Sequence, residues 1–137
     1  ARRQALTSSV RGVRADLRLA QEMALAGKRP PVCEFLHGYY FKRLGAGDQY
    51  GIEAFCRVGL ANVSCSSLYP TLCIKTVNLP AGTTIGPFSP ATIPASTIFF
   101  KVLARGTNVS STTTITLTQA VTLSTQTITI SPGGEIR

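Results

Sequence analysis

The N-terminal part of the chain carries a regular hydrophobic pattern that ends abruptly. Its apolar residues recur in steps of four and three, at Leu6, Val10, Val13, Leu17, Ala20 and Ala24. In an α-helix this spacing places all six side chains on one face. Gly27 tolerates the left-handed backbone that closes a helix, and the prolines at 30 and 31 cannot continue one. The pattern predicts one amphipathic helix over roughly residues 3–26.

After the prolines, the pattern changes to short runs rich in aromatic and β-branched residues. These runs cover residues 32–43, 49–57, 72–79, 97–104, 112–118 and 127–131. Each has the length and composition of a β-strand. The glycine-containing segment 45–48 between the first two runs predicts a hairpin loop. We therefore expect an α+β fold in which an N-terminal helix packs on antiparallel β-sheet.

Two later segments interrupt the strand pattern. Residues 80–94 contain four prolines, each of which lacks a backbone N–H for a ladder bond, so this segment is expected to be a surface loop or an edge excursion. Apolar residues fall on odd positions in the run 112–118 and on even positions in 127–131. That change of parity predicts a turn or bulge within residues 119–126.

The length and composition favour one domain. The chain has 137 residues, of which 44% are hydrophobic and 15% charged, against roughly 25% charged in typical globular proteins. We divide it into a helical segment, 1–29, and a β-rich head, 30–137, that form a single domain together. No stretch approaches the roughly 18 apolar residues of a membrane-spanning helix.

Positive charge is concentrated at the N-terminal end. The net charge is +8, and residues 1–29 account for +5, from seven Lys or Arg against Asp16 and Glu22. Helical spacing puts Arg11, Arg14 and Arg18 on one stripe with Glu22, and Asp16 on the other side of the helix. A solvated helix face explains this stripe more simply than a binding surface does. The charge nevertheless favours acidic partners, such as anionic lipid, nucleic acid or an acidic subunit.

Four cysteines, Cys33, Cys56, Cys65 and Cys73, lie within a short span without C-x-x-C spacing. They predict one or two disulfides and an oxidising, extracytoplasmic location. Three pairings are open. We favour Cys56 with Cys73, because an antiparallel return of the run 72–79 onto 49–57 would bring them opposite, leaving Cys33 with Cys65.

The residues that could carry chemistry are few. His37 is the single histidine, and it forms a C-x₃-H pair with Cys33 that only weakly suggests a metal ligand set. Glu34 and Glu53 are the two carboxylates in candidate paired strands, which is thin material for acid–base catalysis. We predict a protein that is not an enzyme and that has no metal and no cofactor.

The order of elements resembles a known family. Residues 16–27 read DLRLAQEMALAG within the basic helix, the run Ile98-Phe99-Phe100-Lys101 comes mid-domain, and residues 127–137 read TITISPGGEIR. This is similar to the soluble part of type IV pilin-like proteins, in particular H-type minor pseudopilins of type II secretion and FimT-like minor pilins. The family's helix reads L-x-x-A-R-x-x-A-I and its last strand is followed by Gly-Arg-x-Arg. Here Gln21 and Glu135 stand at arginine positions of those motifs, while Gly134 and Arg137 match.

The resemblance implies a structural or assembly subunit of a bacterial type IV pilus or type II secretion pseudopilus. Its partners would be other pilin or pseudopilin subunits and the membrane, reached through an apolar helix expected ahead of Ala1. It would be anchored in the inner membrane before it enters a surface filament or periplasmic pseudopilus. The alternative is a DNA-binding minor pilin in DNA uptake. Weak DNA contact would then fall on the arginines of the helix and tail: Arg2, Arg3, Arg11, Arg14, Arg18 and Arg137.

Overall fold

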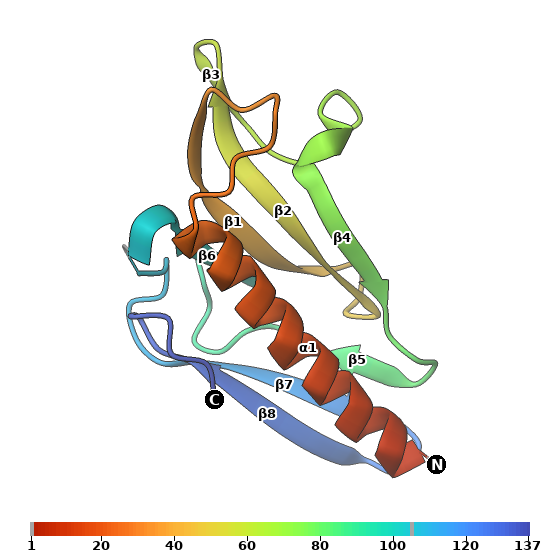
Figure 1. Ribbon diagram of the computed structural model, residues 1–137. Helices are drawn as coiled ribbons and strands as arrows, with labels where there is room; N and C mark the ends of the chain where they lie inside the picture. The colour runs from red at the N-terminus through yellow and green to blue at the C-terminus, as the bar shows by residue number, and fades with distance from the viewer. Residues whose placement is uncertain (1, 105) are drawn as a thin grey trace.

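The computed structural model describes residues 2–104 and 106–137 and has an α+β fold. A single long helix, α1 (Arg2–Leu25), lies diagonally across two antiparallel sheets, as Figure 1 shows. It contacts β1 and β6 of the larger sheet and β5, β7 and β8 of the smaller one. The predicted arrangement of an N-terminal helix on antiparallel sheet is thus confirmed.

The C-terminal end of α1 is closed by hydrogen bonds of the Schellman type. Gly27 has φ +61°, its N–H donates to the carbonyl of Ala24, and the N–H of Lys28 donates to that of Met23. These two bonds satisfy carbonyls that the helix itself leaves unpaired. A side chain would be strained at this backbone angle, which explains why glycine stands where the helix ends.

The larger sheet has five strands. Its strand order is β3-β2-β1-β6, and β4 pairs with β2 beside β3. The strands are β1 (Phe35–Leu44), β2 (Gln49–Val58), β3 (Ala61–Val63), β4 (Cys73–Asn78) and β6 (Thr97–Lys101). The smaller sheet has the order β5-β7-β8 and consists of β5 (Thr83–Ile85), β7 (Thr113–Gln119) and β8 (Ser124–Ile130). Two short 3-10 helices, η1 (Pro70–Leu72) and η2 (Val102–Ala104), complete the described elements.

All six predicted strands are present, with shifted ends. The β1–β2 hairpin turns at residues 45–48, as expected, and a turn at 120–123 separates β7 from β8. The strand predicted to reach 104 ends at Lys101, because Leu103 adopts φ +57° within η2. The sequence patterns missed β3 and β5, which have three residues each and are too short to show a period. β5 lies at a sheet edge within the proline-rich segment.

One hydrophobic core lies between the helix and both sheets. From the larger sheet, Tyr39 and Phe41 of β1 and Ile52 of β2 are buried, since alternate residues of a strand share one face. From the smaller sheet, the buried residues are Ile115, Leu117, Ile128 and Ile130. In β7 and β8 these apolar residues alternate with threonine, as the sequence shows. The apolar side of each sheet therefore faces the helix.

Two disulfides are present, and the pairing favoured from the sequence is wrong. Cys33 is bonded to Cys56, with Cα atoms 5.7 Å apart, and Cys65 is bonded to Cys73, with Cα atoms 4.6 Å apart. β4 does run antiparallel to β2, but the register sets Cys73 opposite Glu53. Because residues 53 and 56 have opposite parity, Cys56 points to the buried face of the sheet and Cys73 does not.

Candidate functional site

The apolar face of α1 is covered from Leu6 to Ala24. Each of the six residues with helical spacing is at most 3% exposed, and they are Leu6, Val10, Val13, Leu17, Ala20 and Ala24. Leu17 and Ala20 lie at full burial, where the small alanine lets the helix backbone approach the sheets. The helix is therefore part of the globular body from its second turn onward.

A buried polar cluster fastens this helix to the larger sheet. The Asp16 carboxylate accepts a hydrogen bond of 2.5 Å from the Tyr50 hydroxyl and forms an ion pair of 2.7 Å with the Lys75 ammonium group. Asp16 is 5% exposed and Tyr50 2%. Burial, and then the hydrogen bond and charge of Asp16, raise the pKa of Tyr50 well above its usual value. We call Asp16, Tyr50 and Lys75 the clasp.

The sequence patterns did not predict the clasp. Asp16 follows Val13 by three residues and precedes Ala20 by four, so helical spacing already placed it beside the apolar face rather than in solvent. The position of Asp16 beside the apolar face was the sequence feature that could have indicated its burial. Its partners lie on β2 and β4, and sequence separation gave no indication of them.

The C-terminal segment is attached to the same helix. Gln21 donates a hydrogen bond of 2.6 Å to the carbonyl of Gly134. Gly134 has φ +96°, and a Cβ there would lie 2.7 Å from the Gln21 side chain, so a larger residue would not fit without a shift. Two backbone bonds between Thr129 and Arg137 then add the last residues to the edge of β8.

The tail arginine is engaged by a neighbouring carboxylate. Arg137 contacts Glu135 Oε1 through Nε at 2.7 Å and through its terminal nitrogen at 2.6 Å. Both side chains are exposed, so solvent screens the pair and its stabilising effect is small. Its effect on recognition is larger, because a phosphate approaching this guanidinium meets a carboxylate first.

Among the described residues, no hydrogen bond or ion pair joins a helix arginine to Glu135 or Arg137. Arg11 and Arg18 are exposed, and Arg14 is half-buried with its Nε atom lacking a hydrogen-bond partner in the described structure. The side chains of Arg2 and Arg3 lie outside the described residues.

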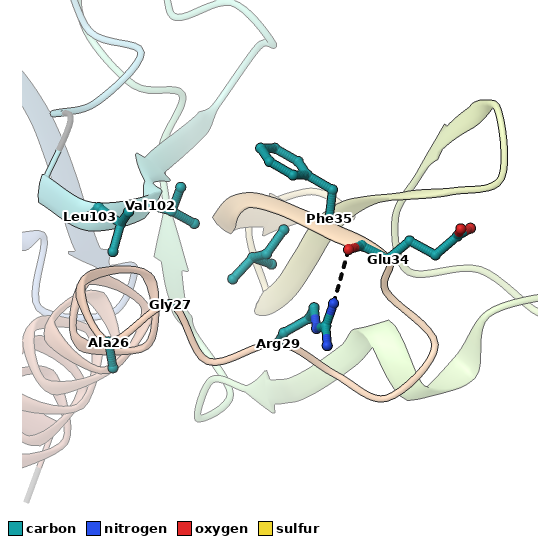
Figure 2. A pocket seen from close by; sticks show the side chains of 8 residues that line it. Ala26, Gly27, Arg29, Glu34, Phe35, Val102 and Leu103 are labelled. Carbon is teal, nitrogen blue, oxygen red and sulfur yellow. Dashed lines mark hydrogen bonds between the residues drawn. The ribbon is translucent and has the colours of Figure 1, made fainter.

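A pocket of about 460 Å³ opens where α1 ends (Figure 2). Its wall is largely apolar, with Leu36, Val102, Leu103 and Phe35 around the helix end. Arg29 lies at its edge and donates a hydrogen bond of 2.9 Å to the Glu34 carbonyl. The size suits a small apolar group or a protruding side chain, with a cation at the rim.

The residues considered for chemistry are used in structural contacts. Cys33 is in a disulfide, and His37 Nε2 lies 2.8 Å from the Asn62 side-chain oxygen. Glu53 is paired with Lys42 at 2.6 Å, and Glu34 accepts a hydrogen bond from the Gly59 amide. Within residues 2–104 and 106–137, no three His, Cys, Asp or Glu side chains gather as a metal site would require.

Comparison with protein-family models, with curated proteins and with solved structures finds no match to this chain. Among the described helices, including α1, none combines the length and the hydropathy that crossing a bilayer requires. The proposal for the function therefore rests on the contacts within this chain.

Proposed function

We propose that this chain is a structural or assembly subunit of a bacterial type IV pilus or type II secretion pseudopilus. The observation that carries the proposal is the placement of α1. It is buried along one face against both sheets and keeps Arg11 and Arg18 exposed on the other. A helix held in this way is rigid and presents one free basic face, which suits packing against neighbouring subunits.

The disulfides support the location that this function requires. Cys33–Cys56 ties the segment after the helix to β2, and Cys65–Cys73 closes a small loop before β4. Stable disulfides belong to oxidising compartments, such as the bacterial periplasm and the cell surface. The proposed partners are other pilin or pseudopilin subunits, together with the membrane through an apolar segment ahead of Ala1.

DNA binding during DNA uptake remains the alternative, and one contact disfavours it. The family's tail motif would present two arginines, whereas here Glu135 stands at one position and pairs with Arg137 at the other. The Glu135 carboxylate contacts two of the three guanidinium nitrogens, and its charge opposes the approach of a phosphate. The structural role therefore has the better support of the two.

The gene and the native cell test the proposal directly. We expect an apolar stretch of about 20 residues immediately upstream of Ala1, because a filament subunit must be held in the membrane before assembly. We also expect the protein in the sheared filament or pseudopilus fraction, and a loss of filaments or of secretion when the gene is deleted. A start codon a few residues upstream of Ala1, with no apolar stretch, would refute the proposal.

A further inference from the structure

Five aromatic rings form a continuous strip on the larger sheet. We call Phe35, His37, Tyr40, Phe55 and Phe99 the aromatic strip. Neighbouring ring centroids are 5.2 Å apart for Phe35–His37, 5.1 Å for His37–Phe55, 5.3 Å for Phe55–Tyr40 and 4.9 Å for Tyr40–Phe99. The rings come from β1, β2 and β6, so the strip crosses three adjacent strands.

The strip lies on the face of the sheet that points away from α1. Tyr39 and Phe41, which flank Tyr40 in β1, are fully buried in the core. Strand alternation therefore turns Tyr40 and its neighbours outward. Phe35 is 50% exposed, and the other four rings are partly exposed. The outer face of an antiparallel sheet is usually polar, so this concentration of aromatic rings calls for an explanation.

Sheet stability explains only part of the strip. A Cβ at Gly38 would lie 2.7 Å from the Phe99 ring, so that ring covers the glycine and shields the sheet there. Cross-strand packing also accounts for the contact between Tyr40 and Phe99, which are paired in register. Phe35 is paired in register with Arg57, but it lies at the end of β1 with half of its surface in solvent, so cross-strand packing accounts for only part of its position.

Cations accompany the rings. The Arg57 guanidinium lies 5.7 Å from the Phe35 centroid, and the Lys42 ammonium lies 4.9 Å from that of Tyr40. Lys101 is exposed opposite Gly38 in the register. Two carboxylates lie nearby: Glu53 is paired with Lys42, and Glu34 accepts a hydrogen bond from the neutral Gly59 amide and keeps its charge. The three cations Arg57, Lys42 and Lys101 therefore outnumber the two carboxylates by one. The strip thus presents aromatic surface with an excess of positive charge.

We propose that the aromatic strip binds single-stranded nucleic acid. Unpaired bases stack on exposed rings whatever their sequence, and cations beside the rings neutralise the phosphates. Arg57 and Lys101 would contact the backbone, while Phe35 and Tyr40 would contact bases. Phe35 also lines the pocket of Figure 2, so the strip ends at a cavity edged by Arg29 that has room for an unstacked base. This inference goes beyond the proposed filament role and does not depend on it.

A duplex should bind this surface poorly. Its bases are paired and stacked inside the helix, so their faces are not available to the rings, and only the phosphates remain to be contacted. This distinguishes the strip from the helix and tail arginines, which could contact any phosphate backbone. A preference for single strands is therefore the signature of the proposed site.

The test is fluorescence anisotropy with labelled oligothymidylate and oligouridylate of about 20 nucleotides, enough to span one such site. A duplex of equal length and a polyuronate of matched charge serve as competitors. We expect both labelled single strands to bind. Either competitor should displace them at least about tenfold less effectively than the same unlabelled single strand does. Binding of only one of the two would assign the ligand as DNA or RNA and would still support the strip. Binding of neither would overturn the proposal.

Matched variants locate the site. Phe35→Ala should weaken binding by about fivefold or more, whereas Val121→Ala, which shortens an exposed apolar side chain in the turn between β7 and β8 of the smaller sheet, should not change it. Arg57→Gln should lower the salt slope by about one, and Arg11→Gln on the helix should leave the slope unchanged. Phe35→Leu keeps apolar contact and loses the ring, so it should behave like Phe35→Ala, and melting curves check that each variant is folded.

Three results would overturn the assignment. The first is equal affinity for duplex and single strand. The second is displacement by polyuronate as effective as by oligothymidylate, since charge alone would then explain binding and an acidic polysaccharide would fit equally well. The third is that Arg11→Gln weakens binding as much as Arg57→Gln does, while folded Phe35→Ala binds with normal affinity.

Discussion

Asp16 on the helix and Tyr50 on β2 are joined by a buried hydrogen bond of 2.5 Å, and the other carboxylate oxygen of Asp16 pairs with Lys75 on β4. The pair therefore connects the helix to two strands of the larger sheet. A buried charge is tolerated only when it is paired and hydrogen-bonded, and both conditions hold for Asp16. The helix is thus fixed in register along the sheet as well as held against it.

Removing the carboxylate of the clasp should destabilise the fold. Asp16→Ala leaves the buried Tyr50 hydroxyl without its acceptor, and we expect a loss of about 1–3 kcal/mol in the free energy of unfolding. Lys75→Gln should cost less than about 1 kcal/mol, because the lysine side chain is 44% exposed and solvent screens its pairing. Urea titrations of both variants measure these losses. A larger loss for Lys75→Gln than for Asp16→Ala would contradict this account.

Stability should fall in alkaline solution as Tyr50 ionises. Burial, followed by the hydrogen bond and charge of Asp16, raises the pKa of Tyr50 in the folded state. The stabilising contribution of the protonated phenol is then fully present below the unfolded-state pKa of about 10 and is lost as the pH rises towards the folded-state value. Tyr50→Phe should lose less stability than the parent between about pH 9 and about pH 11. Thermal melts across this range test the difference, and equal losses in both proteins would count against it.

The helix should depend on its buried leucine. Leu17 is 0% exposed, and Leu17→Ala should cost about 2–5 kcal/mol through lost burial and the remaining cavity. Leu25, on the same helix but 46% exposed, provides the control, because Leu25→Ala should cost much less. Melting temperatures of the two variants decide the matter. An unchanged melting temperature for Leu17→Ala would mean that the helix does not contribute to the core.

The disulfide pairing can be read by mass spectrometry of peptides prepared without reductant. We expect peptides that link Cys33 to Cys56 and Cys65 to Cys73. Replacing both Cys33 and Cys56 by serine should destabilise the protein by about 2–5 kcal/mol, because that bridge constrains the longer stretch of the unfolded chain. Peptides that link Cys56 to Cys73, or four alkylatable thiols in protein from its native compartment, would show the assignment to be wrong.

Binding to duplex DNA should be weak and strongly dependent on salt. Arg137 is paired with Glu135, whereas Arg11 and Arg18 are both exposed on the helix, so Arg11→Gln with Arg18→Gln should weaken duplex binding more than Arg137→Ala does. Glu135→Gln releases Arg137 and should strengthen binding. Titrations at low and at physiological salt measure this. Submicromolar affinity that persists at physiological salt and is abolished by Arg137→Ala would identify a DNA receptor instead.

The sequence pattern was sufficient to predict the features of this protein that depend only on residues close together in the chain. The steps from Leu6 to Ala24 imply a helix because side chains three and four residues apart share a face, and Gly27 implies its end because glycine accepts a positive φ. The parity of Ile115 and Ile128 likewise separates two strands. Each of these inferences uses only neighbours along the chain.

The tertiary structure decided the contacts that depend on register. Cys56 does not meet Cys73, because the pairing of β2 with β4 places Cys73 opposite Glu53, on the other face of the sheet. The pairing of β1 with β2 instead brings the segment that holds Cys33 to Cys56. A shift of one residue would reverse every face, and no short window of sequence carries that information. The aromatic strip has the same origin, since Phe35, Phe55 and Phe99 come from three strands that become neighbours only when the sheet forms. Asp16 shows the combination of both levels, because helical spacing sets the face on which it lies and the packing of helix on sheet supplies Tyr50 and Lys75 as its partners.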